Sequence, residues 1–341
     1  MNIQKLILSA IRALPASLVG KMAGPPVEID GYRLDAHIHL ASKSADLRAG
    51  DGDIEAYRAG AAAALAMTNG PPRRSVKWHD TEFAGPGGAL TMRHYKPAQF
   101  DDIQPAILFF HQGGLVILDL DTCHSFCTQM AEICRAQVFS LDYRLCPEST
   151  FPEPIDDAMA LWDFVQQNAA SLNIDPARVA VAGDSAGGLI SANMCQLLKA
   201  RGGVQAAAQL LAYPWVTTTI TESGSMVSCA DTFPLTRDTM EFFNSYVFPD
   251  GRMMDHALAN PTDNPDLSGL PPAIVATAGF DPIRDQGNAY AEKLKAAGNQ
   301  VTHYCFGSLT HSFLSFGGVT RVAEQACEQL ARDLAKHLHT H

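Results

Sequence analysis

The main pattern along this chain is an alternation of short, wholly apolar runs with longer amphipathic stretches. An apolar run bounded by turn residues is typical of a buried strand, whereas apolar residues at helical spacing indicate a helix. We expect strands at 106–110, 136–143, 179–183, 206–213, 273–280 and 301–306, and helices between them at 121–135, 155–170, 186–200 and 285–298. Apolar strands that alternate with helices predict a parallel sheet covered by helices on both faces.

Ahead of these elements, the pattern changes to an alternation of single apolar and polar residues. The segments "SVKWHDTEF" (75–83) and "ALTMRHYKP" (89–97) alternate in this way and are joined by "AGPGG". Two alternating runs with a glycine-rich connection predict an antiparallel hairpin. The predicted fold class is therefore α/β, with a mostly parallel central sheet of about eight strands that begins with this hairpin.

Two long stretches lack a strand pattern. Residues 1–70 are helical in pattern and end in "NGPP", and residues 215–270 contain one helical stretch at 236–248. Ligands of such sheets bind at the carboxyl ends of the strands, where a helical cover is expected. We therefore divide the chain into an N-terminal cap segment (1–70), a core (71–214), a second cap segment (215–270) and the rest of the core (271–341).

Composition and net charge limit the kinds of partner that this protein can have. The 341 residues include 18% charged and 47% hydrophobic residues and carry a formal net charge of −11. This is a globular composition, and its acidic balance argues against nucleic acid or an anionic membrane as a partner.

The first 24 residues place an apolar stretch after Lys5, as a secretory signal does. However, Arg12 interrupts this stretch and its apolar residues recur at helical spacing, which favours an amphipathic helix that covers apolar surface. No run approaches the roughly 20 apolar residues of a membrane span, so we expect no stable membrane insertion. The eight cysteines form no CxxC pair and lack zinc-ribbon spacing. Reduced thiols in a cytoplasmic enzyme are the expectation.

The strongest chemical signal is "VAVAGDSAGG". Gly183, Ser185 and Gly187 fit G-x-S-x-G, and the motif lies between an expected strand and an expected helix. A serine at such a sharp turn has its hydroxyl exposed at the mouth of the sheet, with a helix N-terminus behind it. Ser185 is therefore the candidate nucleophile.

A serine hydroxyl needs a base, and in this architecture the acid and the base follow the serine in the chain. Asp281 comes directly after the strand expected at 273–280, and His311 lies in the loop after the last strand. Asp285 is better explained as a residue of a helix start, and His303 as a structural residue inside a strand. Asp281 and His311 are therefore the candidate acid and base.

The strand at 106–110 is followed by "HQGG", in which Gly113 and Gly114 leave the backbone bare. When a serine attacks a carbonyl, the oxygen becomes an anion that needs preorganised donors. The N–H groups of Gly113, Gly114 and Ala186, the residue after the nucleophile, are the expected oxyanion hole.

These motifs resemble those of the hormone-sensitive-lipase-like (family IV) carboxylesterases of the α/β-hydrolase fold. The resemblance covers about residues 50 to 335. It rests, in chain order, on "HQGGL", "DYRLCPESTFPEPIDDA", "GDSAGG", "DPIRDQG" and "HSF". It implies a triad of Ser185, Asp281 and His311, and hydrolysis of short- to medium-chain carboxylic esters without a metal or an organic cofactor. Family members often dimerise through the sheet edge, so a homodimer is compatible with the resemblance.

Several positions depart from the family pattern. Gln112 replaces a glycine, where its side chain is expected to line the acyl pocket or brace the loop, beside His111. Leu115 replaces an aromatic residue, Leu118 a glycine, and Cys123-His124 a His-Asp pair. These changes bear on pocket shape and substrate preference. Asp184 is expected to fix the turn by hydrogen bonds.

Three other functions compete with this one. "LDAHIHLA" contains Asp35, His37 and His39, which in a β/α barrel would suggest a metal-dependent amidohydrolase, but the stretch lies in a helical region. Some relatives, such as the plant gibberellin receptor, only bind a ligand and have lost the catalytic histidine, which this chain keeps at His311. A long-chain lipase is the third alternative.

Overall fold

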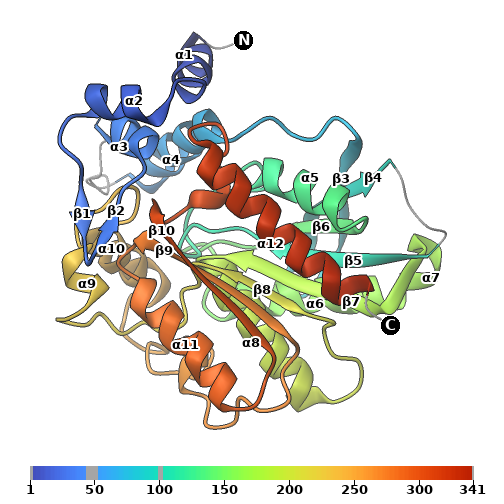
Figure 1. Ribbon diagram of the computed structural model, residues 1–341. Helices are drawn as coiled ribbons and strands as arrows, with labels where there is room; N and C mark the ends of the chain where they lie inside the picture. The colour runs from blue at the N-terminus through green and yellow to red at the C-terminus, as the bar shows by residue number, and fades with distance from the viewer. Residues whose placement is uncertain (1–2, 44–52, 99–102, 340–341) are drawn as a thin grey trace.

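The computed structural model describes residues 3–43, 53–98 and 103–339 (Figure 1). Its centre is an eight-stranded sheet with the order β10-β9-β8-β7-β5-β6-β4-β3. The strands are β3 (Val76–Gly85), β4 (Gly88–Pro97), β5 (Gln104–Phe110), β6 (Gln137–Asp142), β7 (Ile174–Asp184), β8 (Gln209–Ala212), β9 (Ala273–Phe280) and β10 (Val301–Thr310). Only the β3–β4 and β4–β6 pairs are antiparallel. The predicted sheet, including its N-terminal hairpin, is confirmed.

The described residues form twelve α-helices, and some of them cover the two faces of this sheet. The twelve are α1 (Ile3–Arg12), α2 (Ala16–Ala23), α3 (Ala36–Ser42), α4 (Ile54–Thr68), α5 (His124–Ile133), α6 (Glu153–Gln167), α7 (Ala169–Leu172), α8 (Ala186–Arg201), α9 (Ser225–Ser228), α10 (Arg237–Val247), α11 (Arg284–Ala296) and α12 (Arg321–His339). There are also two short 3₁₀ helices, at Pro261–Asp263 and Phe313–Ser315. Buried residues of α5 and α12 pack on one face of the sheet, and those of α6, α8 and α11 pack on the other. Figure 1 shows α12 crossing in front of the strands.

Strand β5 shows why its sequence is apolar at every position from Ala106 to Phe110. Ile107 and Phe109 belong to the core beneath α5 and α12, whereas Leu108 and Phe110 belong to the core beneath α6 and α8. Alternate side chains of a strand point to opposite faces, so a strand covered on both sides has no solvent-facing position. Burial on both faces holds β5 in position, so the loop that follows it starts from a fixed place at His111.

The N-terminal region departs from the helical expectation in one place. A two-stranded antiparallel pair, β1 (Glu28–Ile29) and β2 (Tyr32–Arg33), interrupts the helices. Its turn is made by Asp30 and Gly31, both with positive φ. Four residues are too few to show a strand period, which is why the pattern did not reveal them.

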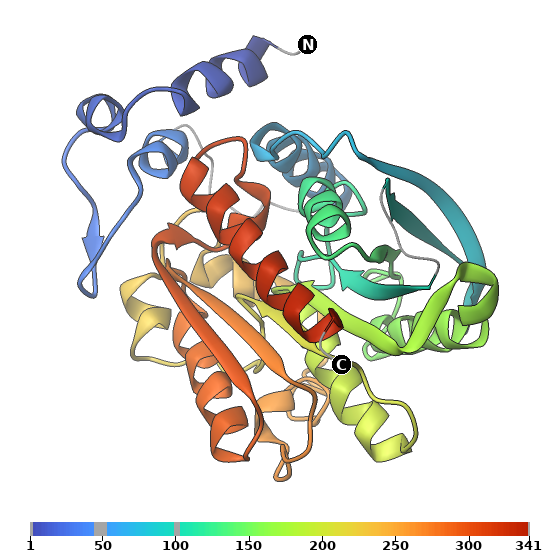
Figure 2. The ribbon, with the colours of Figure 1, turned by 45° about the vertical axis from the view of Figure 1, so that its right-hand side comes forward.

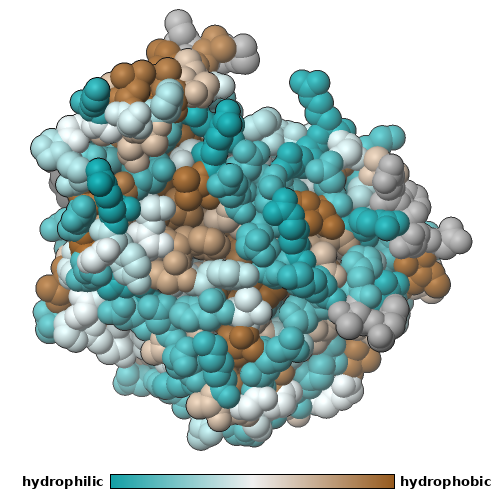
Figure 3. Space-filling view, in the orientation of Figure 1, coloured by the Kyte–Doolittle hydropathy of each residue, from teal (hydrophilic) through white to brown (hydrophobic). Residues whose placement is uncertain are grey.

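Helix α1 forms and covers apolar surface only in part: it contacts α4, and Leu8 and Ile11 are half-buried. Leu6 and Ile7 remain 45% and 54% exposed. Figure 2 shows α1 projecting from the body of the molecule, and Figure 3 shows hydrophobic surface over this corner. Among the described residues, no helix has the length and apolar content that a membrane crossing requires.

Candidate active site

The turn between β7 and α8 holds Ser185 in a strained conformation. Its φ is 53° and its ψ is −113°, a region that non-glycine residues rarely adopt. A Cβ atom at Gly183 would collide with the Gly187 backbone, and one at Gly187 would collide with the carbonyl group of Phe110. The flanking glycines are therefore required because the turn lies directly against β5, and the G-x-S-x-G motif is explained by this packing.

Asp281 and His311 meet although 30 residues separate them. The Nδ1–H of His311 donates to Asp281 Oδ2 at 2.8 Å, and the other Asp281 oxygen accepts the Ile283 N–H at 3.0 Å. Both side chains are buried, and the Tyr213 ring lies 4.7 Å from the imidazole. This arrangement fixes the ring orientation and leaves Nε2 for a reacting group.

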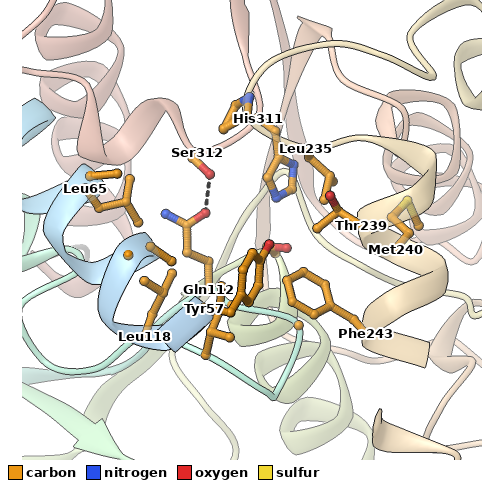
Figure 4. Close-up of a pocket in the computed structure, with 18 of the residues that line it drawn as sticks. Tyr57, Leu65, Gln112, Leu118, Leu235, Thr239, Met240, Phe243, His311 and Ser312 are labelled. Atoms are coloured by element: carbon orange, nitrogen blue, oxygen red, sulfur yellow. Dashed lines mark hydrogen bonds between the residues drawn. The ribbon is translucent and has the colours of Figure 1, made fainter. Parts of the chain in front are cut away.

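Ser185 and His311 line the same cavity (Figure 4). In the part of the chain that the structure describes, no hydrogen bond joins the two side chains. Catalytic hydrogen bonds are often longer without substrate than in the reacting complex.

The loop after β5 brings two glycines to this cavity. Gly113 and Gly114 have φ values of 125° and 61°, and both line the cavity. A Cβ at Gly113 would collide with the Ile117 carbonyl, and one at Gly114 with the Phe243 ring. Neither amide donates to another described residue, and Ala186, as the first residue of α8, has no intrahelical acceptor for its N–H.

His111, at the start of the loop after β5, is held by contacts with Gln112 and Tyr143. Its Nδ1 lies 2.6 Å from the Gln112 carbonyl oxygen, and its ring stacks on Tyr143 with centroids 4.3 Å apart. The Tyr143 hydroxyl donates to the His111 carbonyl at 2.7 Å. Burial lowers the pKa of His111 to about 4, so the ring is neutral at pH 7.

Asp184, next to Ser185, points away from the cavity lining into a buried polar site. Its carboxylate accepts from the Tyr213 hydroxyl at 2.8 Å and from the Cys123 thiol at 3.4 Å. Burial raises the pKa of Asp184 to about 6, and these donors oppose the rise.

The cavity has a volume of about 640 Å³. Its walls come from α4, the loop after β5, the segment before α10, and α10 itself (Figure 4). Helix α4 lies in the first expected cap segment and α10 in the second, so both reach the site. The apolar and aromatic lining includes Tyr57, Leu65, Leu118, Trp215, Leu235, Met240, Phe243 and Phe316. Apart from Leu118, the sequence pattern assigned none of these residues to the site, because a helical pattern does not show what a helix faces.

The competing residues have structural positions. Asp285 lies in the first turn of α11, as expected, and accepts from the Ser225 N–H at 2.8 Å. His303 lies inside β10 and contacts Asn288 at 3.0 Å. Asp35 caps α3 by accepting from the backbone N–H of His37 at 2.9 Å. Within the described ranges, no group of three His, Cys, Asp or Glu residues is placed to hold a metal ion.

Comparison with known proteins agrees with this geometry. A family described as alpha/beta hydrolase fold matches residues 107–315. The chain is 37% identical over 330 residues to the carboxylic ester hydrolase LipN of Mycobacterium tuberculosis, which covers 93% of this chain and 86% of LipN. It is 40% identical over 255 residues to the carboxylesterase NlhH of the same organism, covering 73% of this chain and 79% of NlhH. The thermophilic carboxylesterase EstE1, from a metagenomic library, superposes with a TM-score of 0.79 at 31% identity, covering 85% of this chain and 99% of EstE1.

The chain belongs to the α/β-hydrolase fold family, in its hormone-sensitive-lipase-like group. It is a serine carboxylic ester hydrolase whose substrates are small-molecule esters.

Proposed function

We propose that Ser185, His311 and Asp281 form the catalytic triad, and that Gly113, Gly114 and Ala186 form the oxyanion hole. The observation that carries this proposal is the meeting of Ser185 with the His311–Asp281 pair at one cavity, beside two unbonded glycine amides. These groups follow β5, β7, β9 and β10, whose carboxyl ends lie at the same edge of the sheet.

Hydrolysis proceeds through two half-reactions. His311 removes the proton of Ser185 as its oxygen attacks the ester carbonyl, and the three amides stabilise the resulting oxyanion. Asp281 holds the imidazole in the required tautomer and stabilises the imidazolium. His311 then protonates the leaving alcohol, and water repeats the sequence on the acyl-enzyme to release the acid and restore Ser185.

We further propose that the substrates are short- to medium-chain esters. A cavity of about 640 Å³ matches a small ligand, and its walls are mostly apolar with few polar groups. The cap assignment of 1–70 and 215–270 is part of this proposal, because α4 and α10 close over the site and limit chain length.

Rates over nitrophenyl esters of increasing acyl length test both parts, with Ser185→Ala as the control. We expect the control to lose at least a thousandfold in kcat, as triad serines do. A loss of less than about a hundredfold would contradict the assigned nucleophile. Rates that rise through long acyl chains and jump at an emulsion surface would indicate a lipase instead.

Covalent labelling separates an enzyme from a binding protein of the same fold. An organophosphate should form a stoichiometric adduct at Ser185, detected by mass spectrometry. Absence of that adduct, together with absence of ester turnover, would favour a receptor.

We also propose a cytoplasmic location and a homodimer. All eight cysteines are unpaired, which fits a reducing compartment. Strand β10 ends the sheet, and a second copy would pair on the part of its outer edge that the N-terminal segment leaves open, because the Asp35 N–H already donates to the Ser308 carbonyl at 2.9 Å. Thiol titration of protein isolated under non-reducing conditions and sedimentation velocity measure these two properties.

A further inference from the structure

Three of the proposed site residues, Gly113, His311 and Ser185, each have a buried polar residue next to them in the chain. Gln112 directly precedes Gly113, Ser312 directly follows His311, and Asp184 directly precedes Ser185. All three neighbours are less than a tenth exposed. Buried polar side chains are retained where their hydrogen bonds are satisfied, so their partners show what they hold together.

Gln112 connects the oxyanion loop to the histidine loop. Its Oε1 accepts a hydrogen bond from the Ser312 hydroxyl (dashed line in Figure 4), and its Nε2 donates to Ser315 Oγ at 3.4 Å. The two serines are about 200 residues further along the chain. Gln112 therefore contacts the loop of His311 at two points from the loop that carries Gly113.

The histidine loop depends on outside contacts for its shape. Ser312 has a φ of 64°, in the left-handed region that serine seldom adopts, and Phe313–Ser315 form a single 3₁₀ turn. Such a conformation persists only where the surroundings hold it. The Gln112 side chain is part of these surroundings, because it bonds the residue at which the unusual φ occurs.

The same contacts continue to the nucleophile turn. The Ser315 hydroxyl donates to the Thr122 carbonyl at 2.8 Å and lies 3.6 Å from Cys123 Sγ. The Cys123 thiol donates to Asp184 at 3.4 Å, next to Ser185. Hydrogen bonds thus run from Gln112 through Ser315 to Thr122. The next residue in the chain, Cys123, bonds Asp184, so buried polar contacts connect the neighbours of Gly113, His311 and Ser185.

We propose that Gln112 is a positioning residue for ester hydrolysis: its bond to Ser312 sets the place of His311 relative to the oxyanion amides. This inference rests on the proposed roles of His311 and Gly113. In the transition state, the base and the oxyanion donors must both be correctly positioned relative to the reacting ester. Binding of the substrate in the ground state does not require this precise positioning. Breaking the link should therefore lower kcat more than it raises KM.

Two substitutions remove opposite ends of this link. Gln112→Met keeps the side-chain volume but loses both hydrogen bonds, and Ser312→Ala removes only the hydroxyl. We expect each to lower kcat on a short nitrophenyl ester about tenfold, with KM changed less than twofold. The double variant should be no worse than Gln112→Met alone, because the bond that Ser312→Ala removes is already absent from Gln112→Met. Ser315→Ala is the comparison variant: it removes the weaker Gln112 contact at 3.4 Å together with the Ser315 bond to the Thr122 carbonyl. Its loss should be at most about threefold, because the Ser312–Gln112 bond stays in place.

The outcomes are distinguishable. An unchanged kcat in both single variants would overturn the proposal, and so would losses that multiply in the double variant. A rise in KM alone would show that Gln112 only shapes the pocket. Thermal melting checks that each variant folds, and if Gln112→Met does not fold, Ser312→Ala decides the question alone. Failure of the triad proposal is seen separately, as retained turnover in Ser185→Ala.

Discussion

The wall of the cavity formed by the end of β7 and the start of α8 is buried, whereas the wall formed by α4 is open. In α8, every residue from Ala186 to Cys195 is buried. Helix α4 has no fully buried residue, although it lines the same cavity. Ser185 and Ala186 therefore stand on the buried wall, whereas α4 lines the cavity with half-buried and exposed residues.

The open wall packs against the core with one side, at Tyr57, Ala61 and Leu65, and is also attached by hydrogen bonds. Arg58 donates to the carbonyl groups of Val116 and Cys146 at 2.8 and 2.9 Å. At the other end, the Asn69 side chain donates to the Thr122 carbonyl at 2.9 Å. A helix held in this way tolerates changed side chains between its attachments, so substrate preference can vary while the catalytic geometry stays fixed.

The largest expected effect comes from a methyl group on the buried wall. Gly187→Ala places a Cβ against the Phe110 carbonyl, which neither backbone can avoid. We expect a loss of at least about 4 kcal/mol in the free energy of unfolding, or failure to fold. Urea denaturation measures it, and a loss below about 1 kcal/mol would show that this wall can relax.

The pH dependence of the free energy of unfolding tests how deeply Asp184 is buried in the same wall. Because burial raises its pKa to about 6, the native state holds more protons than the unfolded state between about pH 4 and pH 6. Asp184 therefore lowers the free energy of unfolding as pH rises through this window, by roughly 3 kcal/mol in all. Stability curves of wild type and Asp184→Asn should diverge by about that amount between pH 4 and pH 7, in favour of the variant. Parallel curves would contradict the raised pKa.

On the open wall, the expected change is in selectivity. Ala64 lines the cavity, and Ala64→Leu adds apolar volume to it. We expect kcat/KM for the longest accepted acyl ester to fall about tenfold, with the acetate ester unchanged, since roughly 1–2 kcal/mol of contact is blocked. Ala63→Leu is the matched control, because Ala63 is exposed and outside the lining. The same shift in both variants would place the effect outside the cavity.

The smallest expected effect on stability is that of the corresponding glycine-to-alanine substitution on the open wall, Gly60→Ala. A Cβ at Gly60, within α4, meets nothing within 4 Å. Gly60→Ala should raise the free energy of unfolding by about 0.5–1 kcal/mol through helix propensity, with little change in activity. Destabilisation in urea would show that α4 is packed more tightly than its exposure indicates.

The two walls also differ in how far the sequence predicts them. Gly183, Ser185 and Gly187 lie within five positions, and the strand and helix on either side are periodic, so local pattern was enough to predict the turn. Tyr57 and Phe243 lie far from these motifs, and nothing near either residue indicates that they line one cavity. The β1–β2 pair was missed for the related reason that its strands are too short to have a period.

The sequence by itself determined the alternating elements, the turn at Ser185, the bare glycines after β5 and the chain order of Ser185, Asp281 and His311. These follow from local rules of backbone conformation and from the position of loops after parallel strands. Only the tertiary structure decided that Gln112 bonds Ser312, that α4 lines the same cavity as Ser185, and that α1 leaves Leu6 and Ile7 exposed. Such pairings depend on how separate segments pack, because a side chain's partner is set by three-dimensional proximity and not by spacing along the chain.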